Sequence, residues 1–195
     1  MAITIIQPLS WSSQLGGFDA VELAYNDANS ATYKIGAVLT PNGTAGQLIE
    51  ATAASPTTAI MGIALQPGSN LAAAIAYPNY GQVYPAGSAL AGSSTAGTAN
   101  AVTPLLCAVA APNQVFEGTF ITGATDTAIT SAVVFTKFGL TKDATSGYWY
   151  VDGSKTTTNG SVTVIGIKNV QDITLGTTTG VRVFFVFNIT ETVFI

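Results

Sequence analysis

The run VRVFFVFNIT, residues 181–190, alternates with a period of two and constrains the fold more than any other stretch. One face of the predicted strand is wholly apolar, and the other is mixed and becomes polar at its ends. The apolar face consists of Val181, Val183, Phe185, Phe187 and Ile189. Such a strand belongs in the middle of a sheet, with one face in the core and most of the other covered. A membrane helix would need roughly 18 apolar residues and would not alternate in this way.

Short strand-like runs dominate the rest of the chain and are separated by turn-forming residues. The predicted strands are 33–40, 46–52, 59–65, 73–78, 81–87, 114–122, 147–153 and 161–170. Asn42-Gly43 and Asn159-Gly160 are typical of tight turns, because both residue types tolerate positive φ. This pattern predicts an all-β protein of one or two small antiparallel β-barrel or sandwich units.

The division of the chain follows from the loops. Residues 87–100 repeat Gly at five-residue spacing and read as a flexible connection between two halves. We therefore expect an extended N-terminal arm (1–18), an N-terminal β-domain (19–110) and a C-terminal β-domain (111–195). Residues 126–135 remain open, because Asp126 suits a helix N-cap whereas the β-branched content favours a strand.

Charged residues make up 8% of the chain, against about 25% in ordinary globular domains. Thr, Ser, Asn, Gln and Gly take their place. The cores of protein interfaces are depleted in charge in this way, whereas free surfaces need charge for solubility. Neighbouring molecules are therefore expected to cover much of this surface. The alternative is a Thr-rich β-protein with an uncharged, solvated surface.

Several classes of function are disfavoured by what the chain lacks. It has no histidine and one cysteine, which removes His-dependent catalysis and His- or Cys-rich metal sites. Cys107 reads as a buried small hydrophobe. Six dispersed cations and a net charge of −4 do not predict a nucleic-acid surface. The N-terminal sequence has no basic segment typical of a signal peptide. We expect no cofactor, metal, membrane or nucleic-acid partner.

Two groups of residues are candidates for a catalytic or sugar-binding site. Glu50 and Glu117 lie within predicted strands and form the more interesting acidic pair for glycoside hydrolysis, but most other acids fall in turns, where they serve the backbone. Tyr148, Trp149 and Tyr150 could form a sugar-binding platform, yet alternation points Trp149 away from both tyrosines, which favours core packing. The chain is expected not to be an enzyme.

The strand patterns resemble those of a known class of viral proteins. YKIGAVL, AIMGIAL and YGQVYPAG are similar to the small β-barrel decoration (cement) proteins of tailed-bacteriophage heads. FEGTF, TKFGL, GYWYVDG, VTVIGIKN and VRVFFVF are similar to β-domains of phage capsid-associated proteins. The likeness covers roughly residues 33–195 and consists of strands and turns, so it transfers no binding residue by position.

This resemblance implies a virion protein, made in the host cytoplasm, that binds the outer surface of the capsid. Its partners would be the major capsid protein and further copies of itself, most simply in a homotrimer. The alternatives are a carbohydrate- or receptor-binding module (adhesin) and a tail or baseplate subunit. From their apolar character and their place at the two ends, the expected interface residues are Ile5, Ile6, Leu9, Trp11, Val193, Phe194 and Ile195.

Overall fold

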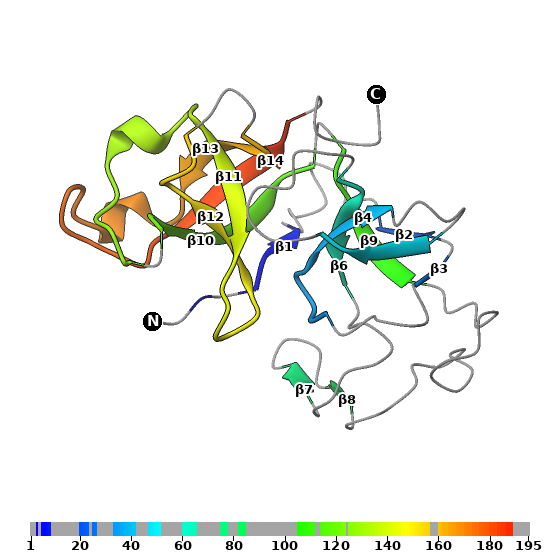
Figure 1. Ribbon diagram of the computed structural model, residues 1–195. Helices are drawn as coiled ribbons and strands as arrows, with labels where there is room; N and C mark the ends of the chain where they lie inside the picture. Colours follow the sequence, from blue (N-terminus) through cyan, green and yellow to red (C-terminus); the bar gives the residue numbers. More distant parts are fainter. Residues whose placement is uncertain are drawn as a thin grey trace.

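The computed structural model describes residues 3, 5–8, 20–23, 25–26, 33–41, 47–51, 60–65, 75–77, 82–84, 105–111, 114–123, 125–156 and 160–188. Within these residues the protein is all-β, as its sequence predicts, and its only helices are two 3₁₀ turns, η1 (Ser131–Val133) and η2 (Val170–Asp172). Strands within residues 116–187 form a closed barrel, and six strands within residues 20–109 form a second sheet (Figure 1).

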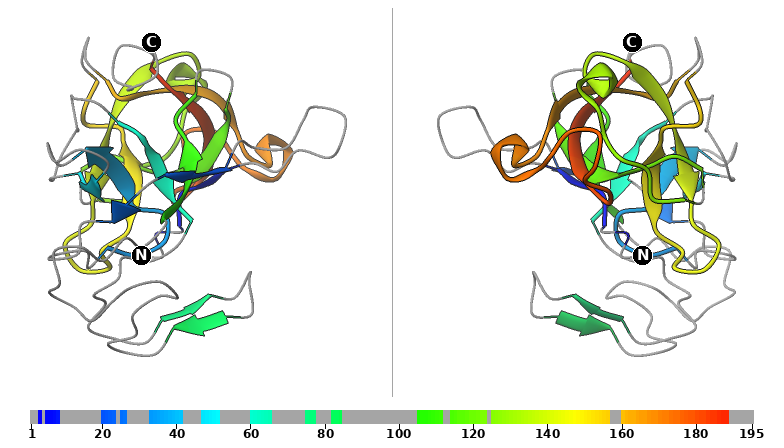
Figure 2. Two further views of the ribbon diagram at one scale, coloured as in Figure 1. Left: turned by 90° about the vertical axis from the view of Figure 1, so that its right-hand side faces the viewer. Right: turned by 90° about the vertical axis from the view of Figure 1, so that its left-hand side faces the viewer.

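The barrel has five strands that pair in the order β10-β12-β11-β13-β14, and β14 pairs back onto β10. They are β10 (Phe116–Ile121), β11 (Lys137–Lys142), β12 (Trp149–Asp152), β13 (Val162–Ile167) and β14 (Arg182–Phe187). The pairings are antiparallel except for β10–β12, which is parallel. The strands curve around a common interior in the side views of Figure 2.

Strand β14 shows the alternation of buried and half-buried side chains that the sequence predicts. The side chains of Val183, Phe185 and Phe187 are buried inside the barrel, while those between them are half-buried. Because β13 and β10 flank β14 on its two sides, it is an internal strand. The prediction of a central strand with one buried apolar face is therefore confirmed for the described residues.

The second sheet has six strands in the order β2-β9-β6-β4-β5-β3. They are β2 (Ala20–Leu23), β9 (Leu105–Val109), β6 (Gly62–Ala64), β4 (Val38–Pro41), β5 (Gln47–Glu50) and β3 (Tyr25–Asn26). Strands β2 and β3 form its two edges although a single residue separates them in the chain. The sheet must therefore curl until its edges approach each other. Strands β7 (Ile75–Tyr77) and β8 (Gln82–Tyr84) form a two-stranded hairpin.

Close backbone approach at β6 depends on a glycine. A Cβ atom at Gly62 would lie 2.1 Å from the carbonyl oxygen of Ala108 on the neighbouring strand β9. A side chain at this position would push the two strands apart.

Buried residues of both sheets belong to one continuous hydrophobic cluster, which includes Ile63 from β6 and Phe116 and Phe185 from the barrel.

Part of the predicted arm belongs to the body of the protein. Strand β1 (Gln7–Pro8) pairs with β10, and the Ile6 side chain is 1% exposed within the core. This position corrects one expectation: Ile6 is covered by its own chain and offers no surface to a neighbour. Removal of residues 1–18 is expected to destabilise the fold, because it would open a gap in the core at Ile6.

The segment that the sequence left open forms neither a strand nor a longer helix. Ile129 and Val133 are both buried, at the spacing of one helical turn, but only the 3₁₀ turn η1 forms. The β-branched residues of this stretch are poor helix formers, which is consistent with so short a turn.

Candidate functional site

The two candidate catalytic carboxylates are held in separate ion pairs. Glu117 on β10 is 2% exposed, and its Oε1 lies 2.6 Å from Lys168 Nζ and 2.6 Å from Arg182 Nε. Burial lowers the pKa of Arg182, and the charge of Glu117 opposes this effect. The guanidinium stays charged in either case. One buried carboxylate oxygen is therefore the shared ion-pair partner of two cations.

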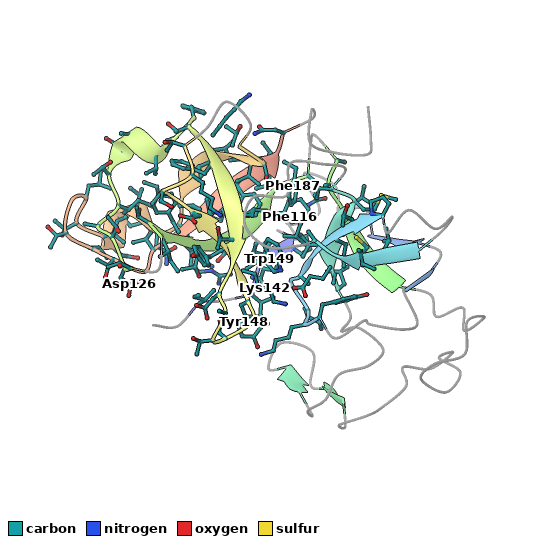
Figure 3. All side chains as sticks on the ribbon, in the orientation of Figure 1. Phe116, Asp126, Lys142, Tyr148, Trp149 and Phe187 are labelled. Atoms are coloured by element: carbon teal, nitrogen blue, oxygen red, sulfur yellow. The ribbon has the colours of Figure 1, made fainter. Side chains whose placement is uncertain are left out.

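Glu50 joins the second sheet to the barrel. Its Oε2 lies 2.6 Å from Lys142 Nζ on β11, and its Oε1 accepts a hydrogen bond of 2.8 Å from Trp149 Nε1 on β12. The labelled side chains Lys142 and Trp149 lie between the two sheets in Figure 3. Glu50 and Glu117 share none of these partners. Each carboxylate is engaged by cations or hydrogen-bond donors of its own chain.

Asp152 is a third buried carboxylate with a structural role. Its Oδ1 accepts hydrogen bonds from Gly123 N (2.9 Å), Ser154 N (3.0 Å) and Ser154 Oγ (2.6 Å), and its Oδ2 accepts one from Thr141 Oγ1 (2.8 Å). Lys155 Nζ lies 3.8 Å from Oδ2. Burial raises the pKa of Asp152, but the hydrogen bonds from Ser154, Gly123 and Thr141 outweigh it, so the pKa is lowered overall.

This lowered pKa predicts an acid-sensitive contribution to stability. It is fully present above the unfolded-state pKa of about 3.9 and is lost as the pH falls through the lower folded-state pKa. Asp152→Asn should destabilise the protein by about 1–3 kcal/mol at pH 7, because it disrupts buried hydrogen bonds. In urea titrations the difference from the wild type should shrink below about pH 4. Asp126→Asn, at an exposed position, is the matched control. A pH-independent difference would contradict the linkage.

The aromatic residues do not form an open platform. Trp149 is 1% exposed in the core and Tyr150 is 5% exposed, with its hydroxyl donating to the carbonyl oxygen of Gly123. Tyr148 is partly exposed, and Lys34 Nζ lies 4.7 Å above its ring. The preference for core packing of Trp149 is therefore confirmed.

Cys107 is buried on β9, as the sequence predicts. Burial raises the pKa of its thiol to about 12, although a backbone hydrogen bond near Ile63 lowers it in part. The thiol is therefore protonated at neutral pH and unreactive in the folded protein.

Most of the cationic side chains form ion pairs or hydrogen bonds within the chain. Lys142, Lys155, Lys168 and Arg182 lie beside buried or largely buried carboxylates, and Lys34 donates to the carbonyl oxygen of Ser146 at 2.7 Å. Among the charged residues whose side chains the structure describes, three are exposed: Asp126, Lys137 and Asp172. The described surface is therefore even poorer in free charge than the composition indicates.

The exposed apolar side chains all belong to one stretch of the chain. All four large hydrophobic residues exposed in the described part of the chain lie between Phe135 and Leu175: Phe135 (80%), Val170 (50%), Leu175 (43%) and Ile165 (36%). We call these four residues the loop patch. They belong to the segment after η1, to β13, and to η2 with its following turn, on the side of the barrel away from the second sheet (Figure 1).

Sequence reasoning did not find the loop patch. The pattern of 161–170 indicates a regular strand, but the pairing of β13 with β14 shifts between Val164 and Gly166, which leaves Ile165 in a bulge. Gly166 is a possible signal, since glycine within a strand often marks a bulge. Phe135 has φ 62°, and nothing in its sequence context predicts a left-handed backbone at a bulky residue.

Of the interface residues expected from the sequence, Ile5 is partly exposed and Ile6 is buried. Leu9, Trp11, Val193, Phe194 and Ile195 lie outside the described residues. The structure therefore describes only two of the seven expected interface residues.

Two other kinds of site are absent from the part of the chain that the structure describes. No group of three or more acidic or cysteine side chains is placed to hold a metal ion there. Within the same residues, no helix has the length and apolarity to cross a membrane. Comparison with known proteins finds no matching family, no matching curated protein and no matching solved structure.

Proposed function

We propose that this chain is a virion structural protein that binds the outer surface of a phage capsid and stabilises the contacts between capsomers. The proposal rests on the composition of the protein surface, which is poor in free charge and carries exposed apolar side chains. Five of its six cations are engaged within the chain, and the exposed apolar residues are concentrated in the loop patch. Surfaces poor in charge and carrying exposed apolar groups are typical of protein contacts.

In the proposed mechanism, binding of this protein stabilises the assembled shell against opening. A protein that binds only the assembled shell stabilises that state by mass action. Each bound copy adds contact area that must be broken before the shell opens, and a homotrimer bridging neighbouring capsomers would multiply this effect. The closed barrel suits such a role, because it has no unpaired strand edges at which copies could aggregate.

Cosedimentation with expanded phage heads that lack the protein tests this proposal. We expect saturable binding and a higher temperature of head opening when the protein is bound. Binding should change by less than about threefold between low and moderate salt, because few free charges are exposed. Lys137→Gln, which removes the exposed cation, should bind like the wild type. Absence of binding to heads, or a loss of orders of magnitude with salt, would overturn the proposal; selective binding to tails would favour a tail subunit.

A further inference from the structure

Residues 142–149, where β11 turns into β12, reach from the barrel to the second sheet, and we call them the strap. Figure 1 shows the strap as the yellow loop below the barrel. Its backbone is braced from within, because Asp143 N donates to the carbonyl oxygen of Tyr148 at 2.8 Å, and Gly147 N donates to that of Asp143 at 2.8 Å. The strap can therefore move as one piece.

Glu50, the last residue of β5, holds the strap at its base. Its Oε2 lies 2.6 Å from Lys142 Nζ, and its Oε1 accepts a hydrogen bond of 2.8 Å from Trp149 Nε1. Lys142 and Trp149 are direct partners in the pairing of β11 with β12. One side chain of the second sheet therefore bridges both strands of the hairpin where the strap begins and ends. The Glu50 backbone is itself fixed, because it pairs with the buried Leu39 of β4.

Lys34 holds the strap near its tip. Its Nζ donates to the carbonyl oxygen of Ser146 at 2.7 Å and lies 4.7 Å from the centre of the Tyr148 ring. A cation over an aromatic ring is attracted by the electrons of its face. The Lys34 carbonyl oxygen accepts a hydrogen bond of 3.1 Å from Ala37 N, in the turn that leads into β4. Lys34 and Glu50 thus flank the β4–β5 pair, and both reach the strap from the second sheet.

The two attachments differ in charge, which favours one seating of the strap over its reverse. At the base an anion of the second sheet meets a cation of the strap, and at the tip a cation of the second sheet meets a carbonyl oxygen and an aromatic ring. A reversed seating would bring Lys34 to Lys142 and Glu50 to the carbonyl oxygen of Ser146, and both contacts would be repulsive. The hydrophobic core between the sheets has no such directionality. The polar contacts therefore specify the position of the strap.

We propose that the strap is a conformational latch that opens from the second sheet and closes on it as one unit while the barrel stays folded. The side chains of Lys142 and Glu50 are 35% and 15% exposed, so water replaces their contact readily when it breaks. The pairing of β10 with β14, which closes the barrel, involves neither strand of the strap. Because the strap is braced from within, loosening its tip should also loosen its base. This inference goes beyond the proposed function, and its test needs no shell.

Hydrogen exchange of the Trp149 indole N–H, followed by NMR on the full chain, measures the opening. This proton is bonded to Glu50 and the residue is 1% exposed, so exchange requires the strap to open. Trp11→Phe removes the signal of the other tryptophan and so assigns the two. In the wild type, exchange should be nearly independent of urea below the unfolding transition, because a local opening exposes little surface.

Lys34→Met tests the coupling between tip and base. The substitution removes the cation but keeps an apolar stem, and it should speed exchange of the Trp149 indole proton by about threefold to tenfold, although Lys34 bonds to the tip. Glu50→Gln, which retains an acceptor for the indole, should speed it similarly, and in the double variant the two factors should multiply. Lys34→Arg keeps a cation over Tyr148 and should stay within about twofold of the wild type. Lys137→Met, which removes the exposed cation at the other end of β11, is the control.

Three results would overturn the proposal. Exchange with the urea dependence of global unfolding would show that the strap does not open separately from the barrel. Unchanged exchange in Lys34→Met would show that the tip and the base open independently. Equal acceleration by Lys137→Met would assign the effect to net charge rather than to the strap. The first measurement uses the wild type, so it decides the question even if a variant does not fold.

Discussion

Replacing Phe185 with Asp is expected to abolish the folded state. The Phe185 side chain is fully buried inside the barrel, with its ring 5.9 Å from that of Phe116 and 5.8 Å from that of Phe187. Truncation of such a residue alone costs about 3–5 kcal/mol. The substitution also buries an unpaired carboxylate, so the total exceeds a large part of the stability of an ordinary domain. Near-ultraviolet circular dichroism and thermal unfolding should show no cooperative transition.

The control for this change lies one residue earlier on the same strand. Phe184 faces the other side of β14 and is half-buried, so Phe184→Asp leaves the new charge in contact with water. We expect a folded protein with a lower unfolding temperature. If Phe185→Asp unfolds cooperatively at a temperature similar to that of Phe184→Asp, the assignment of the two faces is wrong.

Glu117→Gln should produce the largest loss of stability among the polar substitutions. The amide keeps the shape of the side chain but leaves Lys168 and Arg182 beside it without a counter-charge. Breaking a buried ion pair by removing one partner costs about 3–5 kcal/mol. The low end of this range applies here, because the lysine is partly exposed and can turn towards water.

Urea unfolding measures this effect, with Lys168→Gln as the matched control. In that variant Glu117 keeps Arg182, so the loss should be about 1 kcal/mol or less. Equal losses in the two variants would show that the carboxylate does not act as the shared partner.

The sequence determined the strands that have a strong local pattern. The alternation of Val183, Phe185 and Phe187 fixes one buried face whatever the neighbouring strands are, because a shift of one residue would expose all three. The buried positions of Cys107 and Trp149 were likewise predictable, since they depend on residue type and local alternation.

Only the tertiary structure decided how the polar and irregular positions are used. Glu50 and Trp149 are 99 residues apart in the chain, so their hydrogen bond could not be inferred from local spacing. The sharing of Glu117 by two cations, the bulge at Ile165 and the left-handed backbone of Phe135 also arise from strands and loops brought together by folding. Period-two patterns encode which face of a strand is buried, but the partner across a barrel is set by the closure of the whole sheet.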